Sequence, residues 1–192
     1  MSYDITLNDR VTGETLHVNS PHFMTGGTYA VGGTTELWLN ITYNYAHYYY
    51  EATGGDPRFA HDEVSAYHSD GTTGPVVTEY GIRGIYGKTG AESIQMLKDM
   101  IARIEERYKK NGEWISTKRT KTKYFDEHGI EQDDPYKLII SGRPYTKQEY
   151  EIEVNEGPDE NYWEPTAGNA IKPLYQLLAF AEMRPDGVWD GD

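Results

Sequence analysis

"TGAESIQMLKDMIARIEERYK", residues 89–109, carries the clearest periodicity in the chain. Its apolar residues recur at intervals of 3, 4, 3 and 4, which places them on one face of an α-helix. They are Ile94, Leu97, Ile101, Ile104 and Tyr108. Thr89 followed by Glu92 reads as a capping box, in which a hydroxyl and a carboxylate bind the first amides of the helix. We therefore expect a long amphipathic helix, ended by a left-handed residue at Asn111 or Gly112.

A second amphipathic segment spans residues 167–183. Its expected buried stripe consists of Ile171, Leu174, Leu178 and Ala181. Thr166 stands before it as a candidate N-cap. Because proline is best tolerated in the first turn of a helix, Pro173 favours a helix that begins between Asn169 and Lys172.

Strand patterns precede both helical segments. Residues 3–18 contain two β-like runs around Thr12 and Gly13, which is typical of a hairpin. Residues 36–45 alternate apolar and polar side chains, which indicates a strand with one buried face. Because the apolar faces of the helices need a cover, we expect an α+β fold in which a small antiparallel sheet packs on the two long amphipathic helices.

Two segments read as insertions into a single α+β domain spanning residues 1–192. Residues 53–80 are rich in glycine and polar residues and indicate an irregular loop. Residues 113–157 contain three strand-like runs, at 113–125, 136–141 and 148–155. The second insertion is therefore expected to form an appended antiparallel β meander.

The composition excludes several classes of function. The chain has no cysteine, so disulfides, thiolate catalysis and cysteine-bound zinc are ruled out. A formal net charge of −13 opposes direct binding to nucleic acid or to anionic lipid. No apolar run approaches the roughly 18 residues that a membrane span needs, and the first residues lack the features of a signal peptide. We expect a cytoplasmic protein.

The segment GIRGIYGKTG, residues 81–90, looks at first like a phosphate-binding loop. That loop requires four residues between its first glycine and its Gly-Lys pair, and Ile82 stands where the first glycine is needed. A weaker prediction remains, because the amides at a helix N-terminus attract anions. The residues predicted to hold a nucleotide-like anion here are Arg83, Tyr86, Gly87, Lys88 and Thr89, together with the glycine pair Gly26 and Gly27. The alternative is a turn that simply leads into a capped helix.

Five tyrosines and His47 crowd into residues 43–50. Tyrosine rings make good contact residues and can also stack on a base or a sugar. Tyr43 and Tyr45, with Trp163, are therefore candidate ligand-binding residues, and Tyr48 and Tyr49 are candidate protein-contact residues. The alternative is that these rings are half-buried packing residues.

No pattern for a metal, a cofactor or a catalytic group is found. His61, Asp62, Glu63 and His68 have the side chains of metal ligands but match no known ligand spacing. No serine stands in a nucleophile elbow. We therefore expect no cofactor, no metal and a function that is not catalytic, although a small enzyme acting on nucleotides or DNA stays open as an alternative.

The second insertion carries charges in two alternating rows. The basic row consists of Arg119, Lys121 and Lys123, and the acidic row of Glu149, Glu151 and Glu153. If the two rows share a face of the sheet, they partly neutralise each other. If they face apart, the acidic row is free to contact a protein partner, and its two-residue repeat of roughly 6.6 Å resembles the phosphate spacing of DNA only loosely.

Three segments together resemble a family of small uncharacterised proteins of bacteriophages and prophages. They are GGTYAVGGTTELWLNITYNY (residues 26–45), GIRGIYGKTGAESI (81–94) and YWEPTAGNAIKPLYQLLAFAEMRPDGVWDGD (162–192). The resemblance covers about half of the chain and brings no catalytic residue with it. It implies an accessory protein that acts inside a bacterial host cell, where many small acidic phage proteins block or sequester defence components.

The sequence thus leaves three hypotheses. The first is a non-catalytic phage-type accessory protein that binds and blocks a host component through acidic and tyrosine-rich surfaces. The second is a protein that sequesters a nucleotide-like anionic small molecule at the glycine loops. The third is the small enzyme named above. Self-association into a homo-oligomer stays open in all three.

Overall fold

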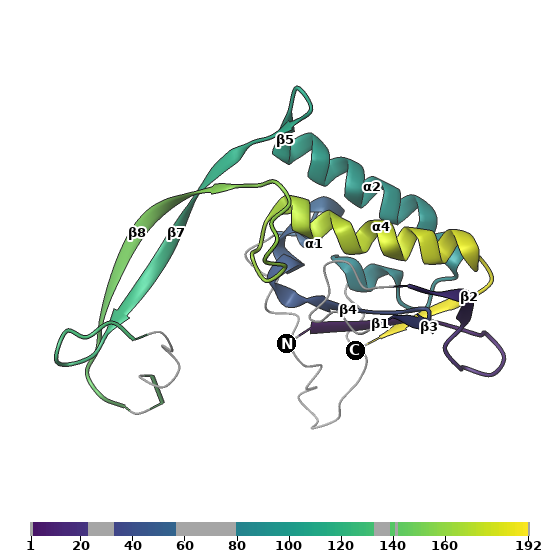
Figure 1. Ribbon diagram of the computed structural model, residues 1–192, viewed down its shortest axis with the longest axis horizontal. Coiled ribbons are helices and arrows are strands. Elements are labelled where there is room, and N and C mark those ends of the chain that lie inside the picture. The colour runs from purple at the N-terminus through teal and green to yellow at the C-terminus, as the bar shows by residue number, and fades with distance from the viewer. Residues whose placement is uncertain (1, 23–32, 57–79, 133–138, 141, 192) are drawn as a thin grey trace. The chain divides into compact units, whose positions relative to one another are not determined.

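The computed structural model describes residues 2–22, 33–56, 80–132, 139–140 and 142–191. These residues form two compact units. Unit 1 comprises residues 1–114 and 157–192, and unit 2 comprises residues 115–156. Mixed helices and small antiparallel sheets confirm the expected α+β class (Figure 1). Most of the segment predicted as an irregular loop, residues 57–79, lies outside the described residues.

A three-stranded antiparallel sheet in the order β4-β1-β9 forms the floor of unit 1. Its strands are β1 (Ser2–Asn8), β4 (Trp38–Thr42) and β9 (Val188–Gly191). Strand β1 is central because it pairs with β4 on one side and with β9 on the other. Its alternate residues Tyr3, Ile5 and Leu7 all face the core. Strand β9 was not predicted from the sequence.

The predicted hairpin within residues 3–18 forms only in part: Asn8 and Thr15 make an antiparallel bridge, and the Leu16 amide donates to the Leu7 carbonyl at 2.9 Å. The chain does turn at residues 9–14, where the amide of Asp9 donates to the Glu14 carbonyl at 2.8 Å. However, β1 pairs with β4 and β9, while β2 (His17–His22) pairs with β3 (Thr34–Glu36) as a separate two-stranded sheet. Distant strands complete the main sheet because they bring the apolar residues Leu39 and Trp189 to it.

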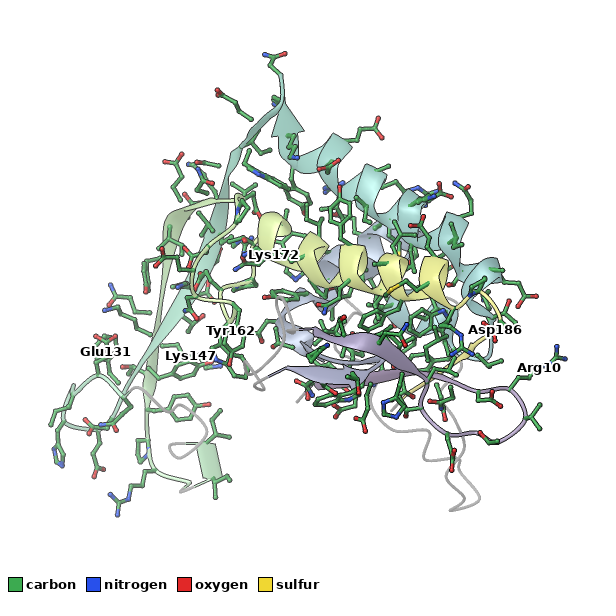
Figure 2. The ribbon with its side chains drawn as sticks, turned by 45° about the vertical axis from the view of Figure 1, so that its right-hand side comes forward. Arg10, Glu131, Lys147, Tyr162, Lys172 and Asp186 are labelled. Atoms are coloured by element: carbon green, nitrogen blue, oxygen red, sulfur yellow. The ribbon has the colours of Figure 1, made fainter. Side chains whose placement is uncertain are left out.

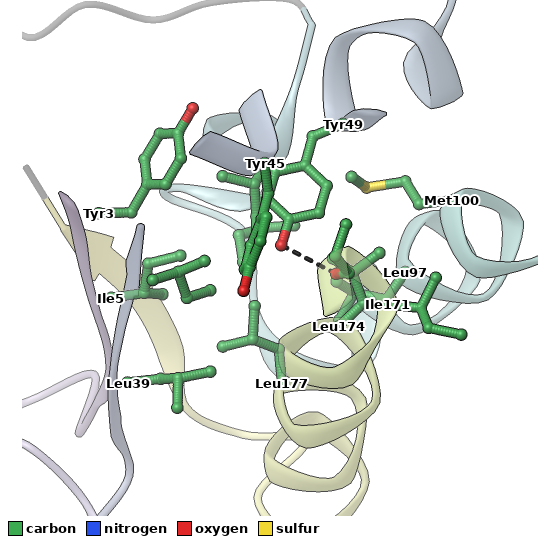
Figure 3. Close-up of a cluster of buried hydrophobic side chains, with 14 of the residues drawn as sticks. Tyr3, Ile5, Leu39, Tyr45, Tyr49, Leu97, Met100, Ile171, Leu174 and Leu177 are labelled. Carbon is green, nitrogen blue, oxygen red and sulfur yellow. Dashed lines mark hydrogen bonds between the residues drawn. The ribbon is translucent and has the colours of Figure 1, made fainter. Parts of the chain in front are cut away.

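Helices α2 (Gly90–Tyr108) and α4 (Ala167–Met183) lie side by side and cover the sheet (Figure 1). The predicted stripe of α2 faces inward, with Leu97, Ile101 and Ile104 buried. In α4 the buried residues include Leu177 and Phe180 in addition to the predicted Ile171, Leu174 and Ala181. Figure 3 shows how side chains from the strands and from both helices meet in one core.

Helix α4 begins earlier than predicted, because it tolerates Pro173 in its interior. The Thr166 hydroxyl caps it by accepting from the Asn169 amide at 3.1 Å, as expected. The side chain of Asn169 also donates to the carbonyls of Asn161 and Glu164. These bonds fix the first turn and offset the helix hydrogen bond that proline cannot make.

Two short elements follow β4: η1 (Tyr43–Tyr45) and α1 (Ala46–Thr53). A second short 3₁₀ helix, η3 (Ile82–Ile85), precedes α2. After α2, the chain forms a small hairpin from β5 (Lys109–Lys110) and β6 (Glu113–Trp114). Asn111 and Gly112 adopt φ angles of 53° and 83° and therefore form the two-residue turn of this hairpin, rather than the end of the helix.

Unit 2 is built on a two-stranded antiparallel ribbon, β7 (Ser116–Phe125) and β8 (Thr146–Asn155). The two strands pair without interruption from Ser116 opposite Asn155 to Phe125 opposite Thr146. Two residues of the predicted middle strand, residues 136–141, are described. They are Ile139 and Ile140, and both are helical rather than extended. Within the described part of unit 2, the expected meander is therefore a hairpin.

No helix in the part of the chain that the structure describes is long and apolar enough to cross a membrane.

Candidate functional site

The glycine turn before α2, residues 81–90, cannot offer an anion the backbone amides that it would need, because amides at the start of the helix already donate to other carbonyls. The amides of Gly90 and Ala91 donate to the carbonyls of Gly187 (2.8 Å) and Pro185 (3.0 Å). The Gly87 amide donates to the Trp189 carbonyl at 2.9 Å. The turn is thus the docking place of the segment that leads into β9, which argues against the predicted anion site.

The capping box engages two further amides at the start of α2, those of Thr89 and Glu92. The Thr89 amide donates to the Glu92 carboxylate at 2.8 Å, and the Glu92 amide donates to the Thr89 hydroxyl at 3.3 Å. The hydrogen bond from the Thr89 amide lowers the pKa of Glu92. A negative charge therefore already occupies the first turn of α2, where a bound anion would compete with it.

The predicted ligand-binding side chains around this turn serve the fold of unit 1. The Arg83 guanidinium donates to the Tyr43 hydroxyl at 2.7 Å and lies 5.0 Å from the centre of the Tyr3 ring. The Lys88 ammonium donates to the Gly84 carbonyl. The Tyr86 hydroxyl lies so close to Gly191 that a side chain at Gly191 would collide with it. Gly26 and Gly27 lie outside the described residues.

Three of the candidate tyrosines are core residues, which corrects the prediction that they form a contact surface. Tyr45, Tyr48 and Tyr49 each have 0% of their surface exposed. The Tyr49 hydroxyl donates to the Ala170 carbonyl at 2.9 Å, the bond drawn in Figure 3. Burial raises the pKa of Tyr49 well above its ordinary value and also raises that of Tyr45. These residues are therefore unavailable to a ligand or a partner.

The hydroxyls of Tyr45 and Tyr48 bind the segment before α4, residues 162–165. Tyr45 donates to the Tyr162 carbonyl, and Tyr48 donates to the Pro165 carbonyl at 2.7 Å. The tyrosine-rich sequence is thus explained by the need to bind a run of backbone carbonyls from inside the core. Trp163, on that segment, is 45% exposed, and its ring packs at a tilt of 35° against that of Tyr162 with ring centres 4.9 Å apart. It is available for contact, but the buried tyrosines do not form a surface with it.

A pocket of about 290 Å³ lies between α1 and α2 and was not anticipated from the sequence. The Glu51 carboxylate lines it and accepts from Arg107 at 2.7 Å and from the Tyr108 hydroxyl at 2.9 Å. Arg103, also in the lining, donates to the Ala52 carbonyl at 2.8 Å. Burial and the hydrogen bond to Glu51 raise the pKa of Tyr108 to about 12. These bonds join the two helices, so the pocket also has a structural role.

The ribbon of unit 2 resolves how the two charged rows are arranged. Residues directly opposite in an antiparallel pair point to the same face. Each member of the acidic row lies opposite Lys118, Thr120 or Thr122, whereas each member of the basic row lies opposite Gln148, Tyr150 or Ile152. The two rows therefore face apart and do not neutralise each other.

The basic row is compensated by carboxylates from elsewhere in unit 2. Arg119 contacts the Glu156 carboxylate at 2.7 Å, and Lys123 contacts Glu131 at 2.9 Å. The hydrogen bond to Glu131 raises the pKa of Lys123. Its ammonium also lies 5.6 Å from the centre of the Tyr150 ring. Only Lys121 in this row has no ion pair among the described residues.

The acidic row is exposed and makes one long ion pair among the described residues. All three of its glutamates are exposed. Glu151 makes a long contact of 3.4 Å with the exposed Lys118, and no described residue forms an ion pair with the other two glutamates. Lys118 and Lys147 lie on the same face at the two ends of the row. Side chains project from both faces of the ribbon, with Lys147 labelled (Figure 2).

The structural roles of two residues were not predicted from the sequence. Trp189 is 1% exposed, and its indole N–H donates to the Ser93 hydroxyl at 2.7 Å. Asn169 is fully buried and holds the start of α4, as described above. A tryptophan in a short alternating run before Gly191 was the available signal for a final strand. Within the described ranges, no group of three or more potential ligand side chains could hold a metal ion.

Comparison of the chain with models of known protein families, with curated proteins and with solved structures gives no match.

Proposed function

We propose that the chain is a non-catalytic binding protein and that unit 2 provides the surface that contacts a partner protein. The acidic row carries this proposal: three exposed carboxylates share one face of a ribbon, and the basic row faces the other way. Only Glu151 of the three has an ion pair among the described residues, a long contact with Lys118, and exposed charges of this kind contribute little to the stability of the fold. The exposed row does favour association with a surface of opposite sign.

Exposed apolar side chains in the same unit support a macromolecular partner. Ile130, Ile139 and Ile140 are exposed by 59%, 50% and 67%, and Tyr145 and Tyr150 are also exposed. Apolar residues gathered on a small unit are typical of contact surfaces. The charges of the acidic row, in the same unit as these apolar side chains, would determine the specificity and the rate of association.

A protein partner fits these observations better than nucleic acid does. Among the described residues, Lys121 is the one cation of the basic row without an ion pair, and one cation is too little to bind a phosphate backbone. Mimicry of DNA is also poorly supported, because the acidic row has three members and is bounded by Lys118 and Lys147. A short basic segment of a protein matches a row of this length.

The resemblance to phage accessory proteins suggests where the partner is found. A protein of that kind would act in the cytoplasm of a bacterial host and block a host component, such as a defence protein. In this proposal unit 1 is the folded support and unit 2 is the binding element.

Capture from a bacterial lysate, followed by mass spectrometry of both proteins and small molecules, tests the proposal. We expect a stoichiometric protein that is retained by the natural chain and released by Glu149→Gln, Glu151→Gln and Glu153→Gln in combination. Equal retention by this triple variant would contradict the proposal.

A matched control makes the same change in charge on unit 1. Glu14, Glu113 and Glu160 are exposed and can be replaced by glutamine together. This control should retain the partner as the natural chain does. Loss of the partner with both triple variants would show that net charge, rather than the acidic row, is responsible.

The pocket between α1 and α2 favours a second candidate, a small anionic ligand. Arg103 and Arg107 both line it, and the bonds to Ala52 and Glu51 use only some of the N–H donors of each guanidinium. Calorimetric titration with nucleotides tests this candidate. Heat release that Arg103→Ala abolishes would support it, and a captured nucleotide in the lysate experiment would displace the protein-contact proposal.

A further inference from the structure

We infer that the outer edge of β8 accepts an extended basic segment of the partner protein as a third strand. This inference rests on the proposed function, since it names the way in which unit 2 would bind. A two-stranded ribbon leaves one side of each strand without a neighbouring strand, and no third strand joins this sheet in the described part of the chain. An added strand would make main-chain hydrogen bonds along such an edge.

The two edges of the ribbon differ in how well they are protected. Proteins commonly block an edge strand with lysine, proline or a bulge. Strand β7 carries Lys118, Arg119, Lys121 and Lys123 along its length. Strand β8 has no lysine, arginine or proline after Lys147, and its register with β7 is continuous. The edge of β8 is therefore the one suited to accept another strand.

The acidic row sets the charge of that strand. Alternate residues of a strand lie on one face and repeat at about 6.7 Å, so the row extends about 13 Å from Glu149 to Glu153. A partner segment with lysine or arginine at every second position places its cations opposite these carboxylates. Opposite charges in such cross-strand pairs are favourable.

The other face of the ribbon sets the residues that lie between those cations. On that face β8 presents Tyr150, Ile152 and Val154, of which Tyr150 is exposed. Apolar residues of the partner segment would extend this face. The segment is therefore expected to alternate basic and apolar residues.

A second copy of the chain does not meet these requirements. Two β8 edges would place glutamate against glutamate, which is destabilising. A second copy's β7, added antiparallel, fails for a geometric reason. The N–H and C=O groups of successive residues point alternately to the two edges of a strand, and residues opposite each other in an antiparallel pair point the same way, either both toward the shared edge or both away from it. The even-numbered residues of the added β7 must therefore again lie opposite the acidic row. The basic row of the second copy would then face away from the glutamates.

A synthetic peptide that alternates lysine and valine over seven residues is the probe for the full-length protein. It is compared with two versions that carry a methyl group on the backbone nitrogen of every second residue, one version for each edge of the peptide. Methylation removes hydrogen-bond donors from one edge and leaves the charge unchanged. We expect the version methylated on the edge facing β8 to bind at least about tenfold more weakly than the other.

The outcomes separate this inference from the proposed function. Equal affinity of the two methylated peptides, whether high or low, overturns strand addition, and failure of the unmodified peptide to bind does so as well. The lysate experiment is unaffected by either result and continues to test the proposed function. Replacing the acidic row by glutamine should weaken the unmodified peptide about tenfold, since each exposed pair contributes roughly a factor of two or more.

Discussion

Replacing Trp189 by alanine should destabilise the protein severely, because this side chain joins the last strand to the start of α2. The ring is 1% exposed, and its N–H donates to Ser93 in the core. Backbone bonds of 2.9 Å link Trp189 to Gly87 and Lys88 on either side of it. The residue is thus held by both its side chain and its main chain.

The magnitude follows from burial. A tryptophan removes about 150–250 Å² from water, at roughly 25 cal/mol per Å², and the cavity left by alanine adds to the loss. We expect the free energy of unfolding of Trp189→Ala to fall by about 4 kcal/mol. For a domain of this size the melting temperature should fall by about 10 °C.

Trp163 provides the matched control, since it is the same residue type in an exposed position. Trp163→Ala should cost less than about 1 kcal/mol, as surface substitutions usually do. Urea denaturation followed by far-ultraviolet circular dichroism measures both variants. If Trp189→Ala does not fold, Trp189→Phe, which loses the N–H donor but keeps an aromatic ring, should still lose about 1–2 kcal/mol. Similar stability of the two alanine variants would refute the assignment of β9 to the core sheet.

Three further predictions concern unit 1. Gly168→Ala should lower the free energy of unfolding by about 3 kcal/mol in chemical denaturation, because its Cβ would lie 2.2 Å from the backbone nitrogen of Pro158; an unchanged value would contradict this close approach. Tyr49→Phe removes the hydrogen bond to a helix carbonyl and should cost about 1 kcal/mol, whereas Tyr175→Phe, at an exposed position, should cost almost nothing in the same assay. The raised pKa of Tyr108, about 12, predicts stability that is complete below about pH 10 and declines as the pH rises toward 12, because the unfolded chain releases a proton that the folded chain keeps. Unfolding midpoints measured across this range test the sign, and Tyr108→Phe should reduce the slope.

Local patterns located the two long helices and strand β4. The spacing of apolar residues identified α2, and the capping box at Thr89 is present as expected. The reason is that helix periodicity and capping depend on residues only three or four positions apart. Alternation likewise located the strand around Leu39, but the prediction of a single buried face was wrong, because Asn40 and Thr42 are buried as well.

Long-range pairing could not be predicted in the same way. The partner of β1 on one side is β9, whose residues lie almost the whole chain away. The same omission affected the candidate site, because it is the β9 segment that occupies the amides of the glycine turn. A free helix N-terminus and one docked against another segment look identical in sequence.

Burial was the other quantity that residue type alone did not reveal. Tyrosine suits both contact surfaces and cores, and only the carbonyls facing Tyr45 and Tyr48 decide between these roles. The charged rows of unit 2 were recognised from their alternation, but the register of the two strands determined that they face apart.

The position of β9 in the sheet has a consequence for synthesis in the cell. As the chain emerges from the ribosome, β1 and β4 are available early, but the other side of β1 and the cover of the glycine turn are made only by residues 185–191. Until then the apolar residue Leu7 has no Trp189 beside it. Unit 1 should therefore complete its folding only after nearly all of its residues have been translated, while the hairpin of unit 2, whose contacts are local, can form earlier.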